Sequence, residues 1–129
     1  MSLAEGFRDS LADMHRLFNA FRNSMRAAGH LLRHEKAFQQ EIALLVLAFP
    51  VGWFLATSWA GYALLIGSLL VLIMVEVLNT GIEAACDAVS REFNIDIKLA
   101  KDCGSLAVLI SVVLAAGVWI MALAQRLSG

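Results

Sequence analysis

The sequence predicts an all-α membrane protein, in which an amphipathic N-terminal surface helix precedes three transmembrane helices. Hydrophobic residues make up 60% of the 129-residue chain, and two long stretches, 42–75 and 103–125, contain no Asp, Glu, Lys or Arg. A helix that spans a bilayer needs about 20 predominantly apolar residues. The charges are instead concentrated in the first 41 residues and in residues 76–102. We therefore expect one membrane domain covering residues 1–129.

Within residues 1–35, eight apolar side chains fall on one narrow helical stripe. From Phe7 to Leu32 these residues recur at spacings of four and three, which is typical of an amphipathic helix. Basic residues such as Arg8 and Arg26 lie off the stripe, where they would attract anionic headgroups. We expect this helix to lie on the cytoplasmic membrane surface. The same repeat would also suit a coiled-coil seam.

The first charge-free stretch is too long for one spanning helix and suits two, with a turn near Ser58–Gly61. The predicted spans are 42–57, 61–83 and 104–126. Pro50 lies in the first of them, which is short and is expected to be kinked or tilted.

Lys and Arg are concentrated before the first predicted span and between the second and third spans. Cytoplasmic loops carry an excess of these residues. We therefore expect the N-terminus and the segment 84–103 to be cytoplasmic and the C-terminus to be periplasmic. Cys86 and Cys103 flank the cytoplasmic segment, where disulfides are rare, and are interpreted as small apolar residues.

The second span ends in VEVLNTGIEAACD, residues 75–87, which places an amide and three carboxylates in one apolar helix. Glu76, Asn79, Glu83 and Asp87 fall within one arc of about 80° at 100° per residue. Ionisable groups within a span are costly, and they usually face a protein interior or a water-filled cavity. The arc therefore predicts a functional polar face.

Depth separates the members of this face. At 1.5 Å per residue from Gly61, Glu76 lies about 22 Å along the helix, just beneath the cytoplasmic boundary of a hydrocarbon core about 30 Å thick. Glu83 then lies about 10 Å above that boundary. Glu35 would reach the same height if the chain to Ile42 is helical. The spacing thus predicts two carboxylates in water and a third at lipid depth.

These residues, with Lys101 and Asp102 at the start of the third span, suit metal-assisted phosphoryl transfer. Magnesium favours carboxylate and phosphate oxygens, and a lysine neutralises phosphate charge. The reaction also needs a group that orients or deprotonates the acceptor. A cation or proton pathway, or structural polar packing, would use the same carboxylates. The chain has no GxxxxGK[ST] or GxGxxG motif, which excludes the usual soluble kinase folds.

Small residues form a separate pattern in the third span. Gly104, Ser111 and Ala115 share one helical face. Small residues let membrane helices approach closely, so this face is interpreted as a packing seam.

Three ordered blocks of the sequence resemble the prokaryotic diacylglycerol kinase family, which includes the undecaprenol kinases. They are EKAFQQE (35–41), VEVLNTGIEAACD (75–87) and AKDCGSLAVL (100–109). The second block is similar to the family signature E-x-x-N-[ST]-x-x-E-x-x-x-D at every fixed position. The resemblance implies a homotrimer with composite sites between subunits, in the bacterial inner membrane. It also implies transfer of the γ-phosphoryl group of Mg-ATP to a lipid hydroxyl.

The resemblance further implies roles for individual residues. Glu76 matches the proposed general base, and Glu35 and Glu83 match the carboxylates that bind Mg²⁺. Asn79 and Asp87 match polar residues important for activity. The positions matched near the nucleotide are Arg16, Glu92, Lys101 and Asp102, and those near the lipid are Phe38, Gln40, Glu41 and Ser105.

Ser105 bears on which lipid is phosphorylated. GSLAV (104–108) resembles the Gly-Ser-Ala-Ala pattern of Gram-negative diacylglycerol kinases more than the Ala-Ala-Gly-Ala-Val pattern of undecaprenol kinases. The resemblance therefore favours diacylglycerol as substrate and phosphatidic acid as product, with an undecaprenol kinase as the alternative. A membrane cation or proton conductor remains the alternative from another functional class.

Overall fold

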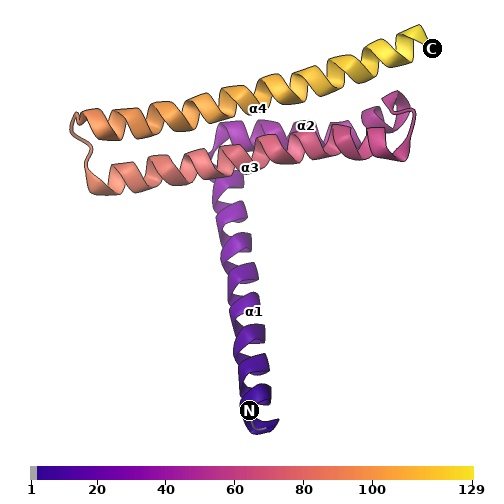
Figure 1. Cartoon of the computed structure of the whole chain (residues 1–129). Coiled ribbons are helices and arrows are strands. Elements are labelled where there is room, and N and C mark those ends of the chain that lie inside the picture. Colours follow the sequence, from indigo (N-terminus) through magenta and orange to yellow (C-terminus); the bar gives the residue numbers. More distant parts are fainter. Residues whose placement is uncertain (1–2) are drawn as a thin grey trace. The chain divides into compact units, whose positions relative to one another are not determined.

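The protein is all-helical in a computed structural model that describes residues 3–129, with side-chain surroundings described from residue 5 (Figure 1). The last three of its helices are long and apolar enough to cross a membrane. This confirms the prediction of an all-α chain with three such helices. The four helices are α1 (Leu3–His34), α2 (Lys36–Leu55), α3 (Trp59–Val89) and α4 (Ile95–Ser128).

The chain divides into two compact units, Met1–Lys36 and Ala37–Gly129. The first unit is essentially α1, which runs without a break for 32 residues. The large side chains of its predicted apolar stripe are exposed, with Phe7, Phe18 and Phe21 each more than 60% accessible. These three phenylalanines are therefore accessible along the length of α1.

Polar caps determine where α3 and α4 begin. The Ser58 hydroxyl accepts a hydrogen bond from the Gly61 backbone N–H at 3.0 Å. The Asn94 side chain accepts bonds from the N–H groups of Asp96 and Ile97 at 2.9 and 3.1 Å. Such caps satisfy backbone donors that have no partner inside the helix. The turn expected near Ser58 therefore corresponds to the short break between α2 and α3.

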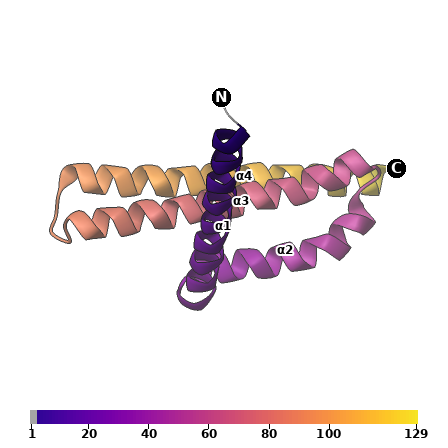
Figure 2. The ribbon, with the colours of Figure 1, turned by 90° about the horizontal axis from the view of Figure 1, so that it is seen from below.

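In the second unit, α3 and α4 run side by side in opposite directions, whereas α2 diverges from α3 away from their shared turn (Figure 2). All three helices contribute to the core, which contains Ala48, Leu69, Leu72 and Ala115. The indole N–H of Trp119 on α4 also donates to a backbone carbonyl of α3 at 3.3 Å. The divergence of α2 leaves an apolar groove of about 390 Å³ lined by all three helices.

The packing face of α4 consists of small residues. Its buried residues are Gly104, Ser111 and Ala115, which confirms the predicted seam. Small side chains allow close approach between helices, and in a membrane this packing contributes much of the association energy.

Aromatic residues gather where α2 meets α3. Trp53 makes edge-on contacts with Trp59 and Tyr62, with ring centroids 5.2 and 5.7 Å apart. The Tyr62 hydroxyl donates to the Phe49 carbonyl at 3.1 Å. Trp and Tyr are enriched at membrane–water interfaces. The cluster therefore indicates a membrane boundary at this end of the second unit.

The helices α3 and α4 are longer than a bilayer core is thick. With 31 and 34 residues, they extend about 46 and 51 Å, beyond the roughly 30 Å of a hydrocarbon core. Because an aromatic cluster is typical of a membrane boundary, we expect the excess length at the opposite end. There α3 and α4 are joined by residues 90–94, and there the polar residues are found.

Candidate active site

The polar residues of α3 continue the face by which this helix packs. Its buried residues are Leu65, Ser68, Leu69, Leu72, Glu76 and Asn79, separated by steps of one, three or four along one side of the helix. The leucines of the core are therefore followed directly by a carboxylate and an amide. This continuity was not predicted, although the spacing of the leucines is visible in the sequence.

Burial changes along the polar face. Glu76 and Asn79 are each only 8% accessible, whereas Glu83 and Asp87 are exposed. A buried carboxylate thus precedes an exposed one by seven residues, which is about 10 Å of helix. One face of one helix presents both a sheltered and a water-facing acidic group.

The Asn79 carboxamide lies between buried Glu76 and exposed Glu83 along α3. Its Nδ2 donates to Oε1 of Glu83, one turn further along, at 3.1 Å. Its Oδ1 is buried and has no hydrogen-bond partner among the described residues. Most buried polar atoms in proteins are hydrogen-bonded, so the position of this amide requires an explanation.

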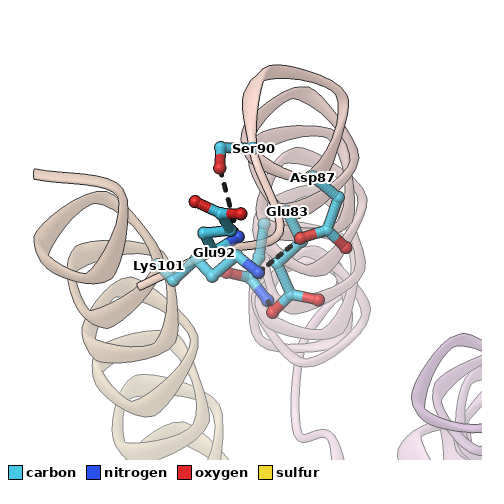
Figure 3. A network of polar contacts seen from close by, with 6 residues as sticks. Glu83, Asp87, Ser90, Glu92 and Lys101 are labelled. Carbon is cyan, nitrogen blue, oxygen red and sulfur yellow. Dashed lines mark hydrogen bonds and ion pairs between the residues drawn. The ribbon is translucent and has the colours of Figure 1, made fainter. Parts of the chain in front are cut away.

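An ion pair joins the ends of α3 and α4. The ammonium group of Lys101 donates to Oδ1 of Asp87 at 2.6 Å. Figure 3 shows Lys101 reaching from α4 toward α3, with Glu83 and Glu92 close by. The backbone N–H of Glu92 in the connecting turn donates to Ser90 Oγ at 3.1 Å. A cation is therefore held within a group of acidic side chains.

A second ion pair lies on α4. Lys98 Nζ contacts Oδ2 of Asp102 at 2.6 Å, and both side chains are 60% accessible. Exposed pairs of this kind add little to stability. Both charged groups therefore remain open to solvent near the start of α4.

The residues predicted to lie near the lipid differ in their surroundings. Glu41 on α2 is partly buried, with one oxygen that has no hydrogen-bond partner among the described residues, and its carboxylate is close enough to Glu76 to repel it electrostatically. Phe38 is buried, whereas Gln40 and Ser105 are exposed. Glu41 and Glu76 thus lie within electrostatic range of each other, and Ser105 lies on α4, one residue after Gly104.

Two further predicted site residues belong to the first unit. Glu35 lies in the break between α1 and α2, where its backbone N–H donates to the Leu31 carbonyl at 2.9 Å. Arg16 lies on α1 with its Nη1 at 3.8 Å from Asp13 Oδ1.

The donor set of the second unit is compatible with a magnesium–nucleotide complex. Among the described residues, no group of three or more His, Cys, Asp or Glu side chains is placed to hold a metal by itself. Magnesium usually keeps several waters and binds through one or two carboxylates together with substrate phosphates. The exposed, hydrogen-bonded carboxylate of Glu83 fits that requirement when phosphates supply the remaining oxygens.

Comparison with known proteins identifies the family. A family profile described as prokaryotic diacylglycerol kinase matches residues 22–123. The chain is 34% identical to the diacylglycerol kinase of Escherichia coli strain K12, in an alignment covering 77% of this chain and 87% of the relative. It is 36% identical to the diacylglycerol kinase of Pseudomonas aeruginosa, with 81% and 85% covered. It is 30% identical to that of Helicobacter pylori strain J99, with 90% and 85% covered.

These matches extend beyond the three sequence blocks and confirm the resemblance that those blocks predicted. With its long apolar helices and the acidic face of α3, the chain belongs to the prokaryotic diacylglycerol kinase family and is a membrane kinase.

Proposed function

We propose that the protein transfers the γ-phosphoryl group of Mg-ATP to the hydroxyl of diacylglycerol, giving phosphatidic acid and ADP, at the cytoplasmic face of the bacterial inner membrane. The observation that carries this proposal is the face of α3, where buried leucines give way to buried Glu76 and then to exposed Glu83. A lipid hydroxyl and a polar nucleotide would meet at such a boundary. The names of the relatives support diacylglycerol as the acceptor.

In the proposed reaction Glu76 acts as general base. Its carboxylate accepts the proton of the lipid hydroxyl as the hydroxyl oxygen forms a bond to the γ-phosphorus. The bond from that phosphorus to the oxygen bridging the β- and γ-phosphates breaks, and ADP leaves with that oxygen. Burial of Glu76 (8% accessible) keeps bulk water away from the proton transfer.

The nucleotide is proposed to bind at the water-facing end of α3 and α4. Glu35 and Glu83 would supply carboxylate oxygens to Mg²⁺, which when bound neutralises charge on the phosphates. Lys101, now paired with Asp87 at 2.6 Å, would donate to a phosphate oxygen. Asn79 and Asp87 would orient Glu83 and Lys101. The other residues proposed to line the site are Arg16, Glu92 and Asp102 for the nucleotide and Phe38, Gln40, Glu41 and Ser105 for the lipid.

The proposed topology places α1 on the cytoplasmic membrane surface and the C-terminus in the periplasm. The uncovered apolar stripe of α1 supports this assignment, because an amphipathic helix can bury such a stripe between headgroups and acyl chains. The segment 84–103, which includes Arg91, Lys98 and Lys101, would then be cytoplasmic.

We propose a homotrimer with composite active sites. Within one chain, 28% or less of each membrane-crossing window is buried, and the apolar groove beside α2 remains open. These surfaces would accept lipid chains or helices of neighbouring subunits.

Mixed oligomers test the composite site. Glu35 and Glu76 lie on different units of the chain, so different subunits could contribute them to one site. At a limiting Mg-ATP concentration, we expect Glu35→Gln and Glu76→Gln subunits, each with little activity alone, to regain partial activity when they are unfolded, mixed and refolded together. Glu76→Gln with Glu83→Gln should show no rescue, because one α3 helix carries both residues. Absence of rescue in the first mixture would contradict composite sites that draw these two residues from different subunits.

A lipid panel tests the proposed reaction. The purified full-length protein in mixed micelles is incubated with γ-labelled ATP, Mg²⁺ and either diacylglycerol or undecaprenol. We expect label in phosphatidic acid. Label only in the polyprenol would assign the protein to undecaprenol phosphorylation. Absence of label from both lipids, together with cation or proton flux in vesicles, would overturn the kinase proposal for this chain.

A further inference from the structure

Gly104 makes room for one side chain. A Cβ added at Gly104 would overlap Oδ1 of Asn79 and would lie 3.2 Å from its Cγ and 3.8 Å from its Cβ. These three nearest atoms all belong to Asn79. The missing side chain on α4 therefore accommodates the carboxamide of α3.

Close helix approach does not by itself account for this glycine. Ser111 and Ala115 occupy the same seam and are buried to 4% accessibility, yet each carries a Cβ. Gly104 differs from them because the polar end of the α3 face lies opposite. The glycine thus occurs where the opposing residue is an amide.

Seating against Gly104 also constrains the amide. Asn79 is only 8% accessible, and its Oδ1 lies in the space beside Gly104 without a hydrogen-bond partner in the described chain. With the oxygen on that side, Nδ2 is directed along α3 to Oε1 of Glu83 at 3.1 Å. A hydrogen bond to a charged acceptor is stronger than a neutral one, and here it restricts the carboxylate of an exposed side chain.

We propose that Gly104 is a positioning residue: its missing side chain seats Asn79 against α4 so that the amide holds the Glu83 carboxylate ready for the magnesium–nucleotide complex. This inference rests on the proposed function, in which Glu83 is a metal ligand. Gly104 acts through Asn79 and itself touches no substrate.

The test compares Gly104→Ala with Gly117→Ala in the full-length protein. Both glycines lie on α4, but a Cβ at Gly117 has no atom within 4 Å. We expect Gly104→Ala to weaken binding of a fluorescent ATP analogue in the presence of Mg²⁺ roughly tenfold or more, the size expected for losing a hydrogen bond to a charged group. Binding of the analogue without the metal should change much less. Gly117→Ala should bind as wild type does.

A double-mutant cycle separates positioning from general packing. Asn79→Ala should weaken Mg-dependent nucleotide binding about as much as Gly104→Ala. Adding Gly104→Ala to Asn79→Ala should then weaken nucleotide binding little further. The overlapping carboxamide and its hydrogen bond to Glu83 are already absent from Asn79→Ala. Thermal unfolding without nucleotide or metal should show the same coupling. If Gly104→Ala alone does not fold, recovery of folding in the Gly104→Ala/Asn79→Ala double mutant supports the contact. The loss of Mg-nucleotide affinity is then measured on Asn79→Ala alone.

Three outcomes would overturn the inference. Gly104→Ala could bind Mg-nucleotide as tightly as Gly117→Ala, the losses at Gly104 and Asn79 could be additive, or Asn79→Ala could keep wild-type affinity. The proposed function is tested by a separate measurement, the lipid phosphorylation assay. It fails if the wild-type protein forms no labelled phosphatidic acid. A wild-type protein that does not bind Mg-nucleotide would overturn both proposals.

Discussion

Glu76→Gln is expected to lower phosphoryl transfer to diacylglycerol at least 100-fold, the usual lower range for loss of a general base. The amide is nearly isosteric with the carboxylate but cannot accept the proton. Glu76 is buried, so bulk water has little access to replace it. Because the residue lies about 10 Å of helix from Glu83, Mg-ATP affinity should stay within about twofold of wild type. Product formation and nucleotide binding are measured on the same preparation.

The control for this substitution is Asp9→Asn, which also neutralises one carboxylate but on the exposed surface of α1. It should leave both measurements unchanged. A Glu76→Gln protein with normal turnover would rule out Glu76 as the base. A protein that loses nucleotide binding together with turnover would instead indicate that Glu76 acts in binding or folding.

Glu83→Gln is expected to weaken Mg-ATP binding about 10- to 100-fold. Magnesium prefers charged carboxylate oxygens to amide oxygens. Asn79 could still donate to the Gln oxygen, so the main loss should be the negative charge. The variant should need more Mg²⁺ for half-maximal activity, and its KM for ATP should rise more than its kcat falls. Nucleotide titration at several Mg²⁺ concentrations measures both effects.

Glu83→Asp provides the matched comparison, because it keeps the charge on a shorter side chain. It should recover part of the Mg-ATP affinity that Glu83→Gln loses. If Glu83→Gln instead lowers kcat with unchanged nucleotide affinity, then Glu83 acts in the transfer step rather than in metal binding.

The sequence predicts the local features of the second unit because helix geometry depends on neighbouring residues. Uninterrupted apolar stretches indicate helices long enough to cross a bilayer, and Ser58 marks the start of α3 by capping it. The alignment of Glu76, Asn79 and Glu83 follows from the 100° rotation per residue. It holds here because α3 continues without a break to Val89.

The sequence does not predict which residues of different helices contact each other. The Asp87–Lys101 pair joins residues 14 positions apart on different helices, and its formation depends on how α4 packs against α3. The sequence predicts a packing role for Gly104, but nothing in the neighbouring residues indicates that it faces Asn79. Such pairings depend on the axial register of two long helices, which charge and hydropathy patterns constrain weakly.

The unbroken course of α3 has a consequence for substrate choice under the proposed roles. Glu76 and Glu83 are attached to one rigid rod, and a single inserted residue between them would swing one carboxylate about 100° around its axis. The helix therefore fixes the axial separation of these two residues, and no loop movement can change it. Under these roles α3 would favour membrane alcohols whose hydroxyl reaches the depth of Glu76 while the phosphate donor is held at Glu83.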